Sequence, residues 1–253
     1  MRRQFGATYS WIESWRDMKK QVCVIGVGRF GAAVAQELYQ SGHDVMALDN
    51  DEAKIQEMLG QVTYAVRADA SNESVLKELD VADFDVAVVA LGSENVQSSI
   101  LITVVLKSIG VPFVISRATN ELHGATLERV GADRVVYPEM ESARRTAHVG
   151  FTPGVIDYMP VVPNFGIIKM RPPEQMYGRT LEEVGLGGAT DKHGVSVLAI
   201  RRGRTSFLHP AKDEEIKPGD VLVVAGSNEH IGELYDAALE LPPPVAAANG
   251  NHR

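Results

Sequence analysis

The 253-residue sequence has a single cysteine, only 6% aromatic residues and no long apolar run. One cysteine cannot form an intramolecular disulfide, which excludes a disulfide-stapled secreted domain. Because Cys23 stands inside the apolar run 22–25, we expect a buried and unreactive thiol. The longest apolar run, 100–106, ends at Lys107 and is far shorter than the roughly 20 residues that cross a bilayer, so no membrane span is expected.

Positive charge is also scarce. Lysine and arginine total 25 against 33 aspartates and glutamates, so the formal net charge is −8. This acidic balance argues against nucleic acid as a partner. The single, buried cysteine fits a reducing cytoplasm.

The first 19 residues have no continuous apolar stretch, which argues against an export signal, and we expect an N-terminal extension over 1–19. Its apolar residues fall at helical spacing, so a short amphipathic segment that lies on a partner or on lipid is the alternative. These residues are Trp11, Ile12, Trp15 and Met18.

Residues 20–149 alternate short, mostly β-branched runs with amphipathic segments, a rhythm typical of βαβ units. The expected strands are 21–25, 44–48, 63–67, 86–90, 113–116 and 134–137. Each is followed by a helical stretch, so the pattern predicts a Rossmann-like, doubly wound parallel sheet with helices on both faces.

A proline-rich stretch interrupts this rhythm, with five prolines between residues 150 and 173. We therefore expect a linker at 150–163 and a small β-rich α/β lobe at 164–241. Its expected strands are 167–170, 195–201, 205–208 and 221–225, with a short helix at 180–186 and a final helix ending near 239. Thr180 with Glu183 and, separately, Ser227 supply the predicted helix caps. The tail 242–253 is expected to be disordered.

A G-x-G-x-x-G string directly follows the first predicted strand and opens an amphipathic helix, the context that a dinucleotide site requires. It comprises Gly26, Val27, Gly28, Arg29, Phe30 and Gly31. Asp49 stands 18 residues beyond the last glycine, at the end of the second strand, where a carboxylate binds ribose hydroxyls and would repel a 2′-phosphate. Asn50 follows it. The pattern predicts an adenine nucleotide, ATP or ADP or NAD or NADH, with phosphates at the helix N-terminus.

Other candidate residues follow the remaining strands, whose carboxyl ends form one rim of a doubly wound sheet. They are Asp69 with Ala70, Leu91 with Gly92, Arg117 and Glu139. Arg29 can reach further phosphate oxygens or remain a surface arginine. Asp69 can meet the adenine edge or cap the next helix, Arg117 can bind phosphate or form an ion pair, and Glu139 can bind a cation near the phosphates or stand at a helix start.

Catalytic signatures are absent. The seven histidines show no metal-ligand spacing, no Walker-type lysine follows the glycines, and the residues after the first domain are too few for a substrate domain. Nucleotide sensing is therefore favoured over catalysis. An NAD-dependent oxidoreductase or an NADH-reading redox sensor is the alternative.

Several longer strings resemble the TrkA/KtrA-type potassium-uptake regulators, which carry RCK domains. They are residues 24–31, 48–49, 68–70, 131–139 and 216–220. The resemblance covers about 19–239 and contains both lobes in the family's order. Members often begin near a Met-Lys-Lys stretch, so Met18 is an expected alternative start.

This resemblance implies a non-enzymatic, cytoplasmic subunit that forms homodimers within a ring and gates a membrane potassium-translocating subunit at the inner face of the membrane. It implies that Gly26, Gly28, Arg29 and Gly31 hold phosphates, Asp49 the ribose, Asp69 and Ala70 the adenine region and Arg117 a phosphate. Glu139 matches a cation-binding position of some relatives. The second lobe resembles one that binds a cyclic dinucleotide in some members.

Overall fold

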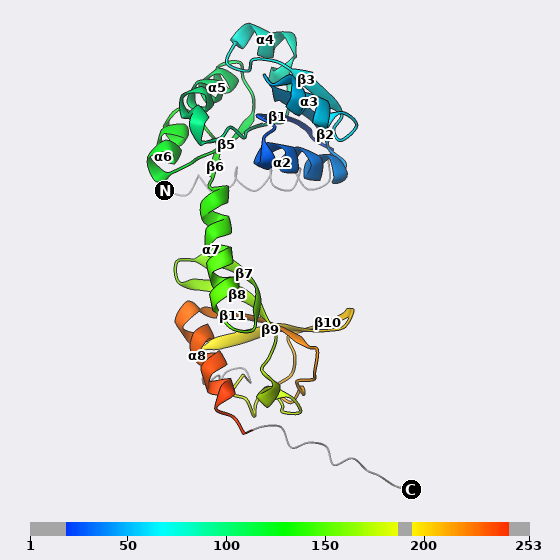
Figure 1. Ribbon diagram of the computed structural model, residues 1–253, viewed down its shortest axis with the longest axis vertical. Coiled ribbons are helices and arrows are strands. Elements are labelled where there is room, and N and C mark those ends of the chain that lie inside the picture. The colour runs from blue at the N-terminus through cyan, green and yellow to red at the C-terminus, as the bar shows by residue number, and fades with distance from the viewer. Residues whose placement is uncertain (1–18, 187–193, 243–253) are drawn as a thin grey trace, which may run out of the picture. The chain divides into compact units, whose positions relative to one another are not determined.

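The computed structural model describes residues 19–186 and 194–242, so nearly all of the expected extension and tail lie outside the described residues. The chain divides into two compact units, residues 1–139 and 140–253 (Figure 1). Within the described ranges, no helix is long and apolar enough to cross a bilayer.

The first unit is built on a parallel sheet of six strands in the order β3-β2-β1-β4-β5-β6. The strands are β1 (Gln21–Ile25), β2 (Asp44–Asp49), β3 (Tyr64–Arg67), β4 (Val86–Val89), β5 (Phe113–Arg117) and β6 (Arg134–Val136). The chain order reverses between β1 and β4, the switch point at which doubly wound sheets bind ligands. The predicted fold class is confirmed.

Helices cover both faces of this sheet, because alternate residues of each strand face opposite sides. The helices are α2 (Arg29–Gln40), α3 (Glu52–Met58), α4 (Glu73–Glu78), α5 (Val96–Ser108) and α6 (Glu121–Arg129), with 3-10 turns η1 (Val81–Asp83) and η2 (Ser93–Asn95). In β1, Val22 and Val24 share a core cluster with residues of α2 and α3, whereas Cys23 shares one with residues of α4 and α5. Burial raises the pKa of the Cys23 thiol to about 12, so the expected inert thiol is confirmed.

The second unit is a five-stranded antiparallel sheet in the order β10-β9-β11-β8-β7, packed against a terminal helix. Helix α7 (Pro138–Phe151) leads into it. Its further elements are β7 (Val155–Val162), β8 (Phe165–Met170), η3 (Glu174–Met176), β9 (Val195–Arg202), β10 (Thr205–Leu208), β11 (Val221–Ser227) and α8 (Asn228–Leu239). Ser227 accepts the His230 N–H at 3.2 Å, as predicted for the cap of α8.

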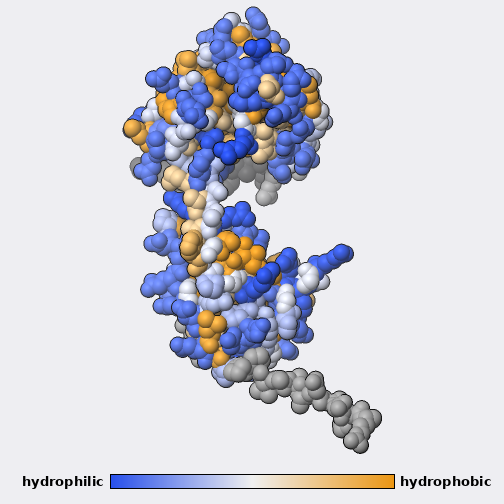
Figure 2. Space-filling view, in the orientation of Figure 1, coloured by the Kyte–Doolittle hydropathy of each residue, from blue (hydrophilic) through white to orange (hydrophobic). Residues whose placement is uncertain are grey.

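Strand β7 lies where we expected a linker at 150–163. Prolines are tolerated there because β7 is an edge strand, and the pairing with β8 shifts register between Pro160 and Val162. Apolar side chains gather on the surface over the end of α7, β7 and β8 (Figure 2). Met159, Val161 and Val162 of this edge are each more than half exposed.

The predicted short helix at 180–186 is wrong, although its predicted capping box is present. The Thr180 N–H donates to Glu183 Oε2 at 2.8 Å, and the Glu183 N–H donates to Thr180 Oγ1 at 3.3 Å. The segment forms a turn instead of a helix, and Thr180 makes an isolated β-bridge with Glu215. The Leu181 and Glu182 N–H groups donate to the Glu214 and Lys212 carbonyls, so pairing with residues 212–215 holds the segment as a turn.

A buried ion pair fixes the turn before β11. The Asp220 carboxylate is fully buried and accepts two hydrogen bonds from Arg202, each at 2.9 Å. Burial opposes ionisation of Asp220, but the Arg202 hydrogen bonds and the Lys217 N–H outweigh it and lower the pKa of the carboxyl. This pair joins β9 to the Lys217–Asp220 turn.

Candidate functional site

The glycine-rich string forms a tight turn between β1 and α2. Gly26 has a φ of 88°, a conformation that favours glycine, and its N–H donates to the Leu48 carbonyl at 2.8 Å. A Cβ at Gly31 would lie 1.9 Å from the Gly26 carbonyl oxygen. Glycine at 31 is therefore what lets α2 begin directly against the turn.

Gly28, the N-cap of α2, faces open space. A Cβ at this position would meet no atom within 4 Å. No side chain caps the helix and no acidic residue lies in its first turn, so its first amides are available to an anion. Arg29 is exposed and has no hydrogen-bond or ion-pair partner among the residues that the structure describes. The start of α2 therefore has the chemistry of a phosphate site.

A pocket lies beside this turn, at the carboxyl ends of β1, β2, β3 and β4. Its volume is about 120 Å³, whereas sites that enclose a whole small molecule measure about 300–1,000 Å³. It can therefore hold only part of a nucleotide. Of the predicted site residues, its lining includes Gly26, Asp49, Asn50, Asp69, Ala70 and Leu91.

Asp49 is the buried carboxylate of this pocket, with a side chain only 6% exposed. One oxygen accepts the Val27 N–H at 2.9 Å, and the other accepts the Asp51 N–H at 3.0 Å. The Nζ of Lys54 lies 3.3 and 3.4 Å from the two oxygens. Asp49 thus links the glycine turn to the start of α3.

Asp69 also lines the pocket and is exposed. Its carboxylate accepts the Ser71 hydroxyl at 2.6 Å and the Ser71 N–H at 2.9 Å, and these hydrogen bonds lower its pKa. Asn72 caps α4, so the alternative that Asp69 caps this helix is wrong. Its carboxylate is left facing the pocket.

Arg117 lies at the end of β5, with its guanidinium carbon 5.6 Å from the centre of the Phe30 ring. Its side chain is 15% exposed and pairs with Glu139, in the first turn of α7. The Arg117 Nε is buried and has no hydrogen-bond partner among the described residues. The arginine is therefore in an ion pair, the second of its two predicted roles, yet keeps one donor unused beside the glycine turn.

The remaining predicted residues are not all part of the pocket. Val27 and Gly28 lie in the turn, Arg29, Phe30 and Gly31 form the first turn of α2, Gly92 precedes η2, and Arg117 and Glu139 form the pair beside Phe30. In the described parts of the chain, no group of three His, Cys, Asp or Glu side chains could hold a metal ion.

Sequence reasoning missed four polar residues that line the pocket, namely Lys54, Ser71, Asn95 and Ser98. Lys54 is the most informative, since it contacts Asp49. The available signal was its position five residues after Asp49, in the helix that follows the strand.

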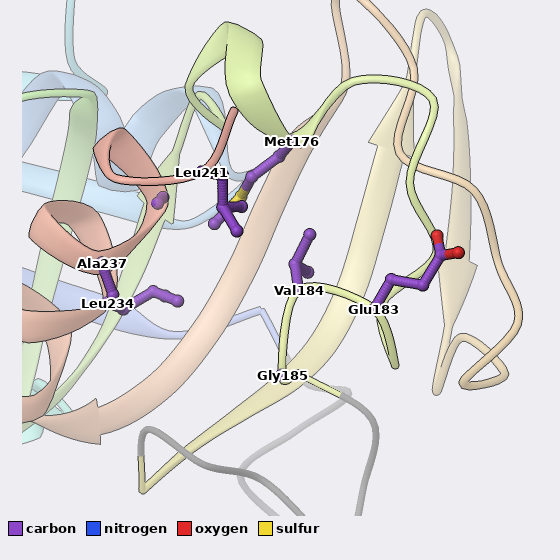
Figure 3. A pocket seen from close by; sticks show the side chains of 8 residues that line it. Met176, Glu183, Val184, Gly185, Leu234, Ala237 and Leu241 are labelled. Carbon is purple, nitrogen blue, oxygen red and sulfur yellow. The ribbon is translucent and has the colours of Figure 1, made fainter. Parts of the chain in front are cut away.

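A second pocket, of about 170 Å³, lies in the second unit (Figure 3). Met176, Val184, Leu234 and Leu241 give it an apolar wall, and Glu183 is committed to the capping box. Because its lining contains no cationic side chain, this pocket does not suit a phosphate.

Comparison with known proteins gives matches over most of the chain. The models of the TrkA-N domain and the TrkA-C domain match residues 22–138 and 167–238. The Ktr system potassium uptake protein C of Bacillus subtilis (strain 168) is 38% identical over 222 residues, which are 88% of this chain and 99% of the relative. The Ktr system potassium uptake protein A of Vibrio alginolyticus is 31% identical, over 84% of this chain and 94% of the relative.

Among solved structures, the crystal structure of the GsuK RCK domain covers 92% of this chain with a TM-score of 0.61, and the chain spans 52% of that structure. The GsuK channel bound to NAD gives a TM-score of 0.59 over 93% of this chain and 44% of that one. Both are 17% identical, so they show a shared fold.

Proposed function

The chain belongs to the family of TrkA-N and TrkA-C domain proteins, and we propose that it is a nucleotide-sensing regulatory subunit of a potassium-uptake system. The uptake proteins that it resembles are matched over nearly their whole length, which supports the same role here. The observation that carries the proposal is the open, uncapped glycine turn beside a pocket with a buried carboxylate.

The ligand that best suits this geometry is an adenine nucleotide, either ATP and ADP or NAD and NADH. Its phosphates would rest on the amides at Gly28 and the start of α2, and its ribose hydroxyls would donate to Asp49. The base would occupy the small pocket between Asp69, Ala70 and Leu91. The exposed Arg29 is free among the described residues to meet a terminal phosphate, the group that distinguishes ATP from ADP.

Arg117 supports a second phosphate contact. Its Nε is buried and has no partner among the described residues, its guanidinium lies over the Phe30 ring, and Glu139 accepts from Nη2. A phosphate would therefore compete with Glu139 for Arg117. A cation bound at Glu139 remains part of the proposal, with the carboxylate as one ligand.

The function is gating without a chemical product. Nucleotides that share the site but differ in phosphate charge would favour different subunit arrangements, since a ligand shifts an equilibrium only through unequal affinity for the two states. We propose that the chain forms homodimers within a ring, in the cytoplasm, under a membrane potassium-translocating subunit. A cyclic dinucleotide is a further proposed ligand of the second unit; it would bind at a dimer interface and not in the apolar pocket, whose lining has no cationic side chain.

Two measurements test this function. Thermal unfolding of the purified chain with ATP, ADP, NAD and NADH at millimolar concentration should show stabilisation by at least one nucleotide. Co-expression with a candidate membrane subunit should restore growth of a potassium-uptake-deficient bacterium. Indifference to all four nucleotides, or turnover of one of them with an organic substrate, would refute the proposal.

A further inference from the structure

Lys54 already contacts the carboxylate that is proposed to hold the ribose. Its Nζ lies 3.3 Å from one oxygen of Asp49 and 3.4 Å from the other. A close ammonium–carboxylate hydrogen bond measures about 2.7–2.9 Å, and the Lys54 side chain is 43% exposed. The ammonium group therefore straddles the carboxylate loosely, and a competing anion can draw it away.

The hydrogen bonds of Asp49 leave little room for a ribose while Lys54 stays in place. A carboxylate offers about four acceptor positions. The N–H groups of Val27 and Asp51 take one on each oxygen, and Lys54 faces both oxygens as well. A ribose hydroxyl that donates to Asp49 must therefore share these oxygens with the ammonium group or displace it.

A second cation stands one strand away. Arg67 of β3 is the register partner of Asp49, and its Nε donates to the Asn50 carbonyl at 3.1 Å. Its guanidinium is 63% exposed and lies 3.9 Å from Glu52, a distant and screened pairing. The neighbouring Asp51 carboxylate is occupied as the cap of α3, where it accepts the Ala53 N–H at 3.0 Å. Two largely exposed cationic side chains thus lie near one buried carboxylate.

We propose that Lys54 determines specificity at the ribose, and that the site accepts adenine nucleotides with a phosphate on the ribose 2′-oxygen. The proposal rests on the proposed function, because that function places the ribose at Asp49. The carboxylate alone would repel such a phosphate, as the sequence indicated. Lys54 offsets this charge, and its ammonium group can move from Asp49 to the 2′-phosphate, with Arg67 as the second cation on that side.

The test compares AMP with adenosine 2′,5′-bisphosphate, two ligands that differ only in the 2′-phosphate, by calorimetric titration of the full chain up to millimolar concentration. The wild-type chain should bind both. Lys54→Met, which keeps helix propensity and side-chain length, should weaken binding of the bisphosphate relative to AMP by about tenfold or more, the effect of losing one hydrogen bond to a charged group. Lys54→Arg, which keeps the positive charge, should bind the bisphosphate relative to AMP as the wild-type chain does.

Lys77→Met is the matched control. Lys77 is also an exposed helical lysine paired with a carboxylate, Glu73 at 2.6 Å, but it does not line the pocket. The Lys77→Met variant should bind AMP and the bisphosphate with unchanged affinities. Thermal unfolding of each variant checks that the fold is kept.

Two results overturn the inference. ADP is titrated as a reference ligand. One overturning result is wild-type protein that binds AMP or ADP but not the bisphosphate, which leaves the proposed function intact. The other is a change in relative affinity smaller than about tenfold in Lys54→Met, which would show that Lys54 only holds Asp49 in place. If no adenine nucleotide binds, ADP included, the proposed function itself is refuted.

Discussion

A substitution at Gly28 can test the proposed ligand binding of the glycine turn without disturbing the fold, because a methyl group there meets no protein atom within 4 Å. Its φ of −70° and ψ of −169° suit alanine as well. Alanine is a poorer N-cap than glycine by about 0.5–1 kcal/mol, but it stabilises through the unfolded chain by about 0.4–1 kcal/mol. The two effects cancel, so Gly28→Ala should leave the thermal unfolding midpoint almost unchanged.

The same methyl group would stand where phosphate oxygens approach the amides of α2. Loss of one hydrogen bond to a charged group costs about 1.5–3 kcal/mol, roughly 10- to 150-fold in affinity. Gly28→Ala should therefore weaken ADP, ATP or NADH binding by about tenfold or more in calorimetric titration.

Gly31→Ala is the contrasting variant. Its Cβ would lie 1.9 Å from the Gly26 carbonyl oxygen, a backbone atom that cannot move aside cheaply, and 3.0 Å from the Ala90 Cβ. We expect destabilisation of about 3 kcal/mol, seen as a lower unfolding midpoint with or without nucleotide. Unchanged nucleotide affinity in a folded Gly28→Ala protein would refute the assignment of phosphates to this turn.

Three further predictions concern other sites. Arg29→Ala should abolish the difference between ATP and ADP in ion flux while nucleotide binding stays measurable; a persisting difference would remove Arg29 from that role. Arg202→Met should lower the stability of the second unit by about 3 kcal/mol in urea unfolding, because it leaves the Asp220 carboxylate buried and unpaired; an unchanged midpoint would contradict this. His123 is buried and burial lowers its pKa, so the unfolded state binds its proton more tightly and stability should fall as pH drops below about 6.5. His123→Gln should make stability less dependent on pH below about 6.5. An identical dependence in the variant would show that His123 is not the group responsible.

Most of the first unit could be predicted from the sequence, because its strands are short, mostly β-branched runs, of which the central ones are buried, and each is followed by an amphipathic segment. Strand β1 runs over 21–25 as predicted, and the other strand limits differ by a residue or so. Strand β7 was missed because proline is a negative signal for a strand, and the edge position that tolerates it is known only from the sheet order.

The sequence predicted which types of residue line the site, but it did not predict which of them form ion pairs with one another. The spacing from Gly31 to Asp49 is a local signal, and it predicted a carboxylate that the structure places in the pocket. The partners of the site residues depend on tertiary geometry. Arg117 and Glu139 are separated by 22 residues, and Lys54 reaches Asp49 only because α3 begins immediately after β2.

The two ion pairs of the site, Lys54–Asp49 and Arg117–Glu139, have the same arrangement of buried and exposed members. In each pair a nearly buried member, Asp49 or Arg117, is held by a more exposed one, Lys54 or Glu139, with exposed fractions of 6% against 43% and 15% against 62%. Loss of the exposed partner alone would leave a nearly buried charge without compensation, but a ribose or a phosphate that takes its place would offset that loss, and the released side chain regains its water. Under the proposed function, binding at this site would be an exchange of partners, in which the gain in free energy would depend on the charge of the incoming group more than on the base. A subunit that must distinguish nucleotides by their phosphates needs such a difference in affinity, since equal binding of all nucleotides would shift no equilibrium.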